Sequence, residues 1–354
     1  WKPIGFQDDP FTGTIDGDGY KITNVTIDGS ETELFGHTQY STIKNLGLEL
    51  VNISAPWGMA GSLVGENKGN IINCYATGEV SSPGSQGVGG LVYWNDGNIT
   101  NSYTAVNVSG AAVIGGLVGI NYDNGVLTDC YTMGNVSATG NIVGGLAGGN
   151  YGKINNCFVT GNVSGNERVG GLIGMNDGNI TDCYVTGAVS GVYQVGGLVG
   201  GCYFPISDCH ASGNVSGESV VGGLVGWIQA EHITNCYATG IISATEAIVG
   251  GLVGLNVVSD IRSSFATGNV TGDNQVGGLA GLNADEGKIT NCYATGAVTG
   301  EDHVGGLVGC NGEVWQGYIK NSFAIGAVLG NNNAGGLVGE FIIGEIEYSY
   351  FDKE

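Results

Sequence analysis

Residues 289–311 read ITNCYATGAVTGEDHVGGLVGCN, and variants of this stretch recur along the chain. Asn-Cys-Tyr-Ala-Thr-Gly stands at 73–78, 235–240 and 291–296, and Gly-x-Val-Ser or Gly-x-Val-Thr follows it in most copies. Gly-Gly-Leu returns every 26–30 residues, with its leucine at positions 91, 117, 146, 172, 198, 224, 252, 279, 307 and 337. A fixed period of this length is typical of solenoids and related repeat architectures.

Each piece of the repeat looks like a short strand. The pieces are rich in Val, Ile, Tyr and Thr and are bounded by Gly or Asn, and no helical period is present. Three short strands per repeat without hairpin signals predict a coil whose strands pair with the same strands of neighbouring turns. We therefore predict an all-β fold, a right-handed parallel β-solenoid (β-helix) of about 12 rungs of 26–30 residues each.

The two ends differ from the middle. Residues 1–30 depart from the repeat and carry Trp1, Phe6 and Phe11, so we expect them to form an N-terminal capping rung. Residues 31–354 are expected to form a single continuous repeat domain. The last repeat stays in pattern up to Phe351, so we expect its open end to contact a further domain of the parent chain or another subunit.

Composition narrows the classes of partner. The chain has 354 residues, of which 69 are Gly and only 12% are charged, with Lys+Arg 10 against Asp+Glu 32 and a net charge of −22. Such a surface repels nucleic-acid phosphates and anionic lipid headgroups. No apolar run is long enough to cross a membrane, so neither nucleic acid nor membrane insertion is expected.

Aligning the repeats within the chain assigns a role to each column. One column contains only small residues, Ser or Cys, so we expect it to point into a tight interior as buried free thiols. Disulfides between stacked rungs are the alternative. The aromatic column beginning at Tyr75 should form a stacked ladder, and the asparagine column beginning at Asn67 a left-handed, hydrogen-bonded ladder at a corner. The cysteines of the interior ladder are Cys74, Cys130, Cys157, Cys183, Cys209, Cys236 and Cys292.

At this point the sequence resembles a known family. Val-Gly-Gly-Leu-Val-Gly together with Asn-Cys-Tyr-Ala-Thr-Gly-x-Val is similar to the GLUG repeat of large bacterial and archaeal surface proteins and of some IgA-cleaving metallopeptidases. The start at Trp1-x-Pro3-Ile4-Gly5 and the finish at residues 349–354 resemble the usual ends of such arrays. The resemblance implies an extracellular or cell-surface location, with other surface-protein subunits or further domains of the parent chain as partners.

No catalytic constellation stands out. The motif His-Glu-x-x-His is absent, Arg168 and Arg262 occupy different repeat positions, and the four histidines share no column. Asp129, Asp182 and Asp208 do share a column, but Asn replaces Asp in most other repeats, so we interpret it as a second corner ladder. We therefore expect no enzymatic activity.

Few residues qualify for metal or ligand binding. Asp16 and Asp18 alternate as in calcium loops, but the remaining ligands are missing, so we interpret the segment as a turn and keep calcium only as a weak alternative to no cofactor. Trp94 and Trp227 share a repeat position and are expected to be buried. Trp57 and Trp315 lie in longer bends and are the candidates for stacking on a sugar ligand.

The chain is also rich in acceptor sequences for N-glycosylation, Asn-x-Ser or Asn-x-Thr. Most of them come from Gly-Asn-Val-Ser copies in one strand, where glycans on adjacent rungs would collide. The candidate glycosylation sites are Asn24, Asn52, Asn98, Asn107, Asn135, Asn162, Asn179, Asn214 and Asn269.

Together these observations favour a non-enzymatic structural or adhesive repeat domain of an extracellular surface protein or surface filament. A polysaccharide-binding or polysaccharide-degrading β-helix, with glycans as the partner, is one alternative. A spacer domain of a larger secreted peptidase is the other.

Overall fold

The structure is a computed structural model that describes residues 2–29, 33–56, 58–84, 87–230 and 232–352. These residues form strands and no helix, and the strands pair in parallel in three sheets, as in a β-solenoid of about 12 turns. The predicted fold class is therefore confirmed. Within the described ranges no helix is long and apolar enough to cross a membrane.

The chain divides into two compact units, which are described separately. Unit 1 comprises Trp1–Asn166 and Leu172–Cys183, and unit 2 comprises Glu167–Gly171 and Tyr184–Glu354. In each unit the three sheets carry different columns of the repeat. We call them the asparagine sheet, the tyrosine sheet and the glycine sheet, after the Asn67, Tyr75 and Gly89 columns.

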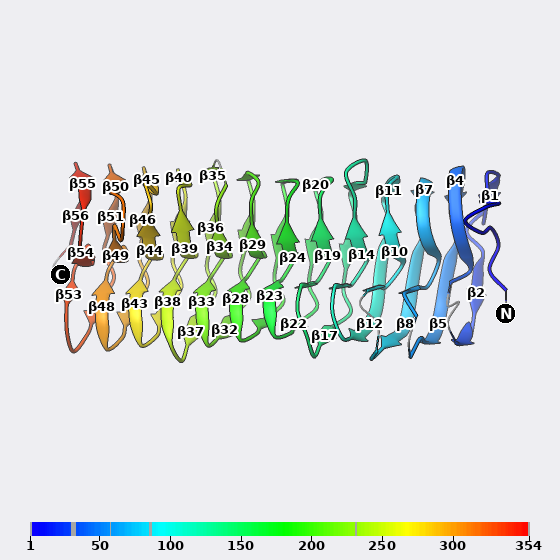
Figure 1. The fold of residues 1–354 in the computed structure, drawn as a ribbon, viewed down its shortest axis with the longest axis horizontal. Coiled ribbons are helices and arrows are strands. Elements are labelled where there is room, and N and C mark those ends of the chain that lie inside the picture. The colour runs from blue at the N-terminus through cyan, green and yellow to red at the C-terminus, as the bar shows by residue number, and fades with distance from the viewer. Residues whose placement is uncertain (1, 30–32, 57, 85–86, 231, 353–354) are drawn as a thin grey trace. The chain divides into compact units, whose positions relative to one another are not determined.

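In unit 1 each strand pairs in parallel with the equivalent strand of the next turn (Figure 1). The asparagine sheet contains β1 (Thr14–Asp16), β4 (Phe35–Lys44), β7 (Val64–Ile72), β10 (Val92–Asn95), β11 (Asn98–Thr100), β14 (Val118–Asn121), β15 (Val126–Thr128), β19 (Ala147–Asn150), β20 (Lys153–Asn155), β24 (Ile173–Asn176) and β25 (Asn179–Thr181). The tyrosine sheet contains β2 (Lys21–Thr23), β3 (Thr26–Asp28), β5 (Gly47–Ser54), β8 (Tyr75–Ser82), β12 (Tyr103–Gly110), β16 (Tyr131–Thr132), β17 (Val136–Ala138), β21 (Phe158–Val159) and β22 (Val163–Ser164). The glycine sheet contains β6 (Ala60–Gly61), β9 (Val88–Gly89), β13 (Ile114–Gly115) and β18 (Val143–Gly144).

Unit 2 repeats the arrangement with fewer irregularities. Its asparagine sheet contains β29 (Val199–Cys202), β30 (Ile206–Ser207), β34 (Val225–Ile228), β35 (His232–Thr234), β39 (Val253–Val257), β40 (Asp260–Arg262), β44 (Ala280–Ala284), β45 (Lys288–Thr290), β49 (Val308–Asn311), β50 (Gly317–Lys320), β54 (Val338–Phe341) and β55 (Gly344–Glu347). Its tyrosine sheet contains β26 (Tyr184–Val185), β27 (Val189–Ser190), β31 (His210–Ala211), β32 (Val215–Gly217), β36 (Tyr237–Ala238), β37 (Ile242–Ala244), β41 (Phe265–Ala266), β42 (Val270–Thr271), β46 (Tyr293–Ala294), β47 (Val298–Thr299), β51 (Phe323–Ala324), β52 (Val328–Leu329) and β56 (Tyr350–Phe351). Its glycine sheet contains β23 (Glu167–Gly170), β28 (Tyr193–Gly196), β33 (Ser219–Gly222), β38 (Ala247–Gly250), β43 (Asn274–Gly277), β48 (Asp302–Gly305) and β53 (Ala334–Gly335).

The core of each unit consists of in-register apolar columns. In unit 1, Ile43, Ile71 and Ile99 are register partners in consecutive rungs, and all are fully buried. In unit 2, Ile233 and Ile261 continue the same pattern. Neighbouring parallel strands lie about 4.8 Å apart, so identical side chains stack at van der Waals distance and exclude water.

Close backbone approach explains the Gly-Gly of the repeat. A Cβ at Gly196 would stand 2.0 Å from the carbonyl oxygen of Val199, and one at Gly197 would stand 2.1 Å from that of Gly223 in the next rung. Side chains would clash with the backbone at such distances, so from Gly89 onward glycine occupies both positions of this turn, whereas the earlier turn has Gly61 followed by Ser62.

The left-handed residues differ from the prediction. The Asn67 column, expected to be left-handed, is not. Positive φ occurs instead in the column before the cysteine, for example at Asn73 (φ 52) and Asp129 (φ 55), and before Val-Gly-Gly, for example at Ile248 (φ 64). Asn and Asp tolerate this conformation, whereas a β-branched residue adopts it only where its surroundings enforce it.

The N-terminal segment lies along β4. Isolated bridges pair Ile4 with Phe35 and Phe11 with Thr38, and the rings of Phe11 and Phe35 lie 5.3 Å apart. The segment therefore forms one wall of the outer surface around β4, where the candidate site lies.

Candidate ligand-binding site

A pocket of about 480 Å³ opens on the outer face of unit 1, between the N-terminal segment and strands β4, β7 and β10. His37 and Glu66 contribute polar groups to its wall, and Met59, Tyr93 and Trp94 contribute apolar surface. The volume falls in the range of small-molecule sites, and so does the combination of aromatic surface with a few polar groups.

Strand register brings the central residues together. His37, Glu66 and Trp94 occupy one outward-facing column in three consecutive rungs, because β4, β7 and β10 pair in parallel and in register. The residues one position later, including Asn67 and Asn95, are fully buried. The pleat of these strands thus buries the asparagine column and exposes the functional one.

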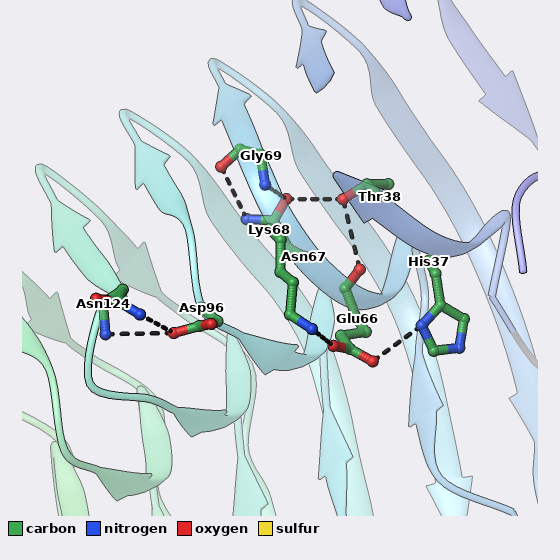
Figure 2. A network of polar contacts seen from close by, with 8 residues as sticks. All are labelled: His37, Thr38, Glu66, Asn67, Lys68, Gly69, Asp96 and Asn124. Atoms are coloured by element: carbon green, nitrogen blue, oxygen red, sulfur yellow. Dashed lines mark hydrogen bonds and ion pairs between the residues drawn. The ribbon is translucent and has the colours of Figure 1, made fainter. Parts of the chain in front are cut away.

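The polar part of the site is a connected network (Figure 2). His37 Nδ1 lies 2.9 Å from Glu66 Oε2, and Lys68 Nζ lies 2.5 Å from Glu66 Oε1, so both carboxylate oxygens are held. The ion pair with Glu66 raises the pKa of Lys68. On the neighbouring positions of the same strands, Thr38 Oγ1 donates to Asn67 Oδ1 at 3.0 Å, the first bond of the buried asparagine ladder. The carboxylate of Glu66 therefore lies on a strand that the asparagine ladder holds in place.

A second hollow adjoins the first. It has a volume of about 230 Å³ and is lined by Gln7, His37 and Glu66, which also line the larger pocket, together with Thr38 and Lys68. His37 and Glu66 thus face both hollows. The edge of the imidazole bearing Nε2 makes no hydrogen bond among the described residues.

Stacked aromatic rings extend away from the pocket. The rings of Trp94 and Tyr122 are 4.2 Å apart and nearly parallel, at 12°, and Tyr151 follows at 5.7 Å from Tyr122. Tyr93 meets Trp94 edge-on at 6.2 Å. Trp94 is half-buried and lines the pocket, so the prediction that it is simply buried at a corner is wrong. The ring of Trp94 is half-exposed because it faces the pocket that it lines together with Tyr93 and Met59.

A departure from the repeat creates this hollow. Position 93 is glycine in the neighbouring repeats, at Gly119 and Gly148, but here it is tyrosine. Opposite it stands Gly87, where those repeats carry Val113 and Ile142, and a Cβ at Gly87 would lie 2.1 Å from the ring of Tyr93. Tyrosine at position 93 thus goes together with glycine at position 87, because only glycine there leaves room for the ring of Tyr93. The broken motif Gly-Leu-Val-Tyr at 90–93 was the sequence signal that could have identified the site.

The predicted aromatic candidates lie elsewhere. Trp315 is 63% exposed and lines a hollow of about 380 Å³ in unit 2 with Gln229, Val258 and Asp285. Trp57 lies outside the described residues. Trp227, the repeat equivalent of Trp94, is half-buried and packs edge-on against Tyr203 at 4.9 Å.

The acidic turn at Asp16 is occupied by protein groups. Asp16 Oδ1 accepts hydrogen bonds from the Asp18 amide at 3.0 Å and from Asn45 Nδ2 at 2.9 Å, and Oδ2 pairs with Lys44 Nζ at 2.9 Å. The Asn45 bond and then the Lys44 contact lower the pKa of Asp16 to about 2. Among the described residues no group of three or more metal-binding side chains occurs.

All nine cysteines are buried, and none of them forms a disulfide. Burial raises the pKa of Cys74 to about 11 and that of Cys292 to about 12. The alternative of disulfides between rungs is not observed, and these thiols are poor nucleophiles at neutral pH.

The column before the cysteines forms a corner ladder of hydrogen bonds. Asn156 Nδ2 donates to Asp129 Oδ1 at 2.6 Å, and Asn235 Nδ2 donates to Asp208 Oδ1 at 3.2 Å. These carboxylates thus accept hydrogen bonds from the next residue of their own column.

The nine candidate glycosylation asparagines are all exposed. Several use their side-chain oxygen within the solenoid: Asn107 Oδ1 accepts the amide of Asn135 at 3.0 Å, and Asn269 Oδ1 accepts that of Ala297 at 3.0 Å. Attachment of a glycan to Nδ2 leaves this acceptor in place.

Comparison with known proteins agrees with the repeat. The model of the GLUG motif matches residues 58–81, 139–164, 165–190, 217–243 and 272–299. Among solved structures, the crystal structure of a candidate immunoglobulin A1 protease from Bacteroides ovatus is 21% identical, with 93% of this chain and 72% of that chain covered and a TM-score of 0.29. A comparison with curated proteins finds no match. The GLUG motif thus recurs at five places along the parallel β-solenoid, which confirms the resemblance seen in the sequence.

Proposed function

We propose that the chain is a non-enzymatic structural and adhesive repeat domain of an extracellular surface protein or surface filament. The contrast between its inner and outer columns carries this proposal. Ile43 and Ile71 keep one chemical type from rung to rung, whereas an outward position of the same sheet changes from His37 to Glu66 to Trp94. A constant interior with a varied exterior is what a scaffold needs in order to present a recognition surface.

Three further observations support the same proposal. The net charge of −22 keeps copies of the chain soluble and discourages contact with nucleic acid and anionic lipid. GLUG repeats also occur in surface proteins. The carboxylate of Glu66 is held by His37 and Lys68, which suits binding better than proton transfer.

Adhesion can be measured directly with beads. Beads coated with the whole chain should adhere to epithelial cells or to mucus-coated plates more than beads coated with albumin at equal density. The same protein should release no product from neutral or acidic polysaccharides, with or without calcium. Coated beads that adhere no better than albumin beads contradict the adhesive role, and turnover abolished by replacing a surface carboxylate contradicts the non-enzymatic one.

A further inference from the structure

We propose that the pocket formed by His37, Glu66, Tyr93 and Trp94 binds a neutral pyranose unit of a glycan, and that the row Trp94–Tyr122–Tyr151 contacts further sugar units of the same chain. The proposal deepens the adhesive function above and rests on it. It assigns a ligand class to a site in unit 1 whose tryptophan was expected to be buried.

The surface chemistry matches a pyranose ring. Such a ring presents an apolar face of C–H groups and a polar rim of hydroxyl groups, so it needs a flat aromatic surface beside planar hydrogen-bonding groups. Tyr93 and Trp94 supply the aromatic surface, and His37, Glu66 and Gln7 supply the planar polar groups within the same hollow of about 480 Å³.

The geometry provides more than one subsite. The smaller hollow of about 230 Å³ shares Gln7, His37 and Glu66 with the larger one, so adjacent sugar units could contact the same polar residues. Beyond Trp94, the ring of Tyr122 is stacked on it at 4.2 Å and Tyr151 is 45% exposed. A linear oligosaccharide that crosses successive rungs therefore contacts Trp94, Tyr122 and Tyr151 in turn.

The site is organised before a ligand arrives. Glu66 is fixed by His37 on one oxygen and by Lys68 on the other, and Trp94 is fixed by Tyr122. Side chains already held in place lose little conformational entropy on binding. Burial also raises the pKa of Tyr93, so its hydroxyl stays protonated and able to donate at neutral pH.

The negative charge around the pocket favours neutral sugars over anionic ones. Glu33 and Glu66 line the pocket and Asp96 lies near Lys68, while the whole chain carries a net charge of −22. The lysine and histidine at the site are both paired with Glu66, so uronic acids, sialic acids and sulfated sugars meet repulsion without a compensating cation.

Binding of defined oligosaccharides to the whole chain tests the proposal. The neutral probes are cellotetraose and tri-N-acetylchitotriose, the anionic probe is trigalacturonate, and the measurements are isothermal titration calorimetry and tryptophan fluorescence. At least one neutral probe should bind with one site per chain, and trigalacturonate should not bind. Absence of binding by both neutral probes, or equally tight binding of trigalacturonate, overturns the proposal.

Variants locate the site. Tyr93→Gly restores the residue that neighbouring repeats carry, so it should fold normally yet weaken binding of the neutral probe about ten-fold, as should Trp94→Ala. Trp227→Ala is the matched control, because Trp227 holds the same repeat position in unit 2. Loss of affinity in Trp227→Ala equal to that in Trp94→Ala contradicts the assignment. If chain-coated beads adhere but both neutral probes fail, the sugar site is wrong and the adhesive function stands.

Discussion

The backbone N–H of Cys74 donates a hydrogen bond at 3.0 Å to Oγ of Ser102, one rung further along the solenoid. Ser102 Oγ in turn donates to the carbonyl of Thr100 at 3.0 Å. In the cysteine version of this arrangement, the amide of Cys157 donates to Cys183 Sγ at 3.4 Å. The interior column thus needs a side chain that is small and that both accepts and donates, which only serine and cysteine provide.

This relay predicts a graded response at Cys183. Cys183→Ser should leave stability nearly unchanged, because the hydroxyl takes over both bonds. Cys183→Ala should cost about 1–3 kcal/mol, because the buried amide of Cys157 loses its acceptor. Cys183→Leu should cost more still, by overpacking the interior. Midpoints of denaturant titrations measure the series, and equal stability of the Ser and Leu variants would contradict the inward assignment.

Thiol reactivity should be almost absent in the folded chain. Desolvation raises the pKa of Cys74 to about 11 and of Cys310 to about 12, so hardly any thiolate exists at pH 8. A disulfide reagent such as DTNB should label none of the thiols quickly in native buffer and all nine in guanidinium chloride. Rapid labelling of one thiol in native buffer would show that its rung opens.

Register is what made the fold predictable from the sequence. A period of 26–30 residues places every copy of a position directly above the previous one, so the small Cys/Ser column and the aromatic column could be assigned before any coordinates. Tyr103 and Tyr131, for example, stack at 4.8 Å with their planes 3° apart. The asparagine ladder followed in the same way, with Asn95 and Asn121 joined at 2.8 Å.

The candidate site was not predictable to the same degree. Its pocket depends on Gln7 and Met59, which lie outside the repeat pattern and reach Trp94 only through the folded N-terminal segment and a long bend. The left-handed backbone was also assigned to the wrong column, because the period of a repeat indicates where a side chain points but does not determine the backbone angle φ. Asp129, at φ 55, shows that the left-handed corner lies before the cysteine.

The buried asparagine ladder should reject a carboxylate. Asn121 accepts from Asn95 Nδ2 at 2.8 Å and donates to Asn150 Oδ1 at 2.8 Å, with no exposed surface. Asn121→Asp keeps the acceptor, loses the donor and buries a charge, so it should cost about 3 kcal/mol or more at pH 7. Burial raises the folded-state pKa of such a carboxyl above its unfolded value, so stability should be present at low pH and lost as pH rises through the folded pKa.

Asn269→Asp is the control for the ladder variant. Asn269 is exposed and uses only its oxygen, which accepts the amide of Ala297, so an aspartate preserves the bond. Thermal unfolding of both variants at pH 4 and pH 7 measures the effect. If the two variants lose the same stability at pH 7, the ladder contributes less than its geometry indicates.

His210 should make the stability of unit 2 depend on pH. Its ring is stacked between Tyr184 at 5.2 Å and Tyr237 at 4.6 Å, and burial lowers its pKa below the ordinary value of 6.5. The unfolded chain therefore binds the proton more readily than the folded chain. The contribution of the neutral ring is present above pH 6.5 and is lost as the pH falls below that value. Contact of an imidazolium with two ring faces offsets part of this loss.

His210→Phe should remove that dependence without disturbing the ladder, because phenylalanine already occupies the column at Phe265 and Phe323. Denaturant midpoints of the variant and of the natural chain should differ more at pH 5 than at pH 8, in favour of the variant. Tyr237→Phe serves as the control, since it changes the neighbouring ring but removes no group that titrates in this range. Parallel profiles for the natural chain and for His210→Phe between pH 5 and pH 8 would show that the ladder accommodates the charged imidazole as easily as the neutral one.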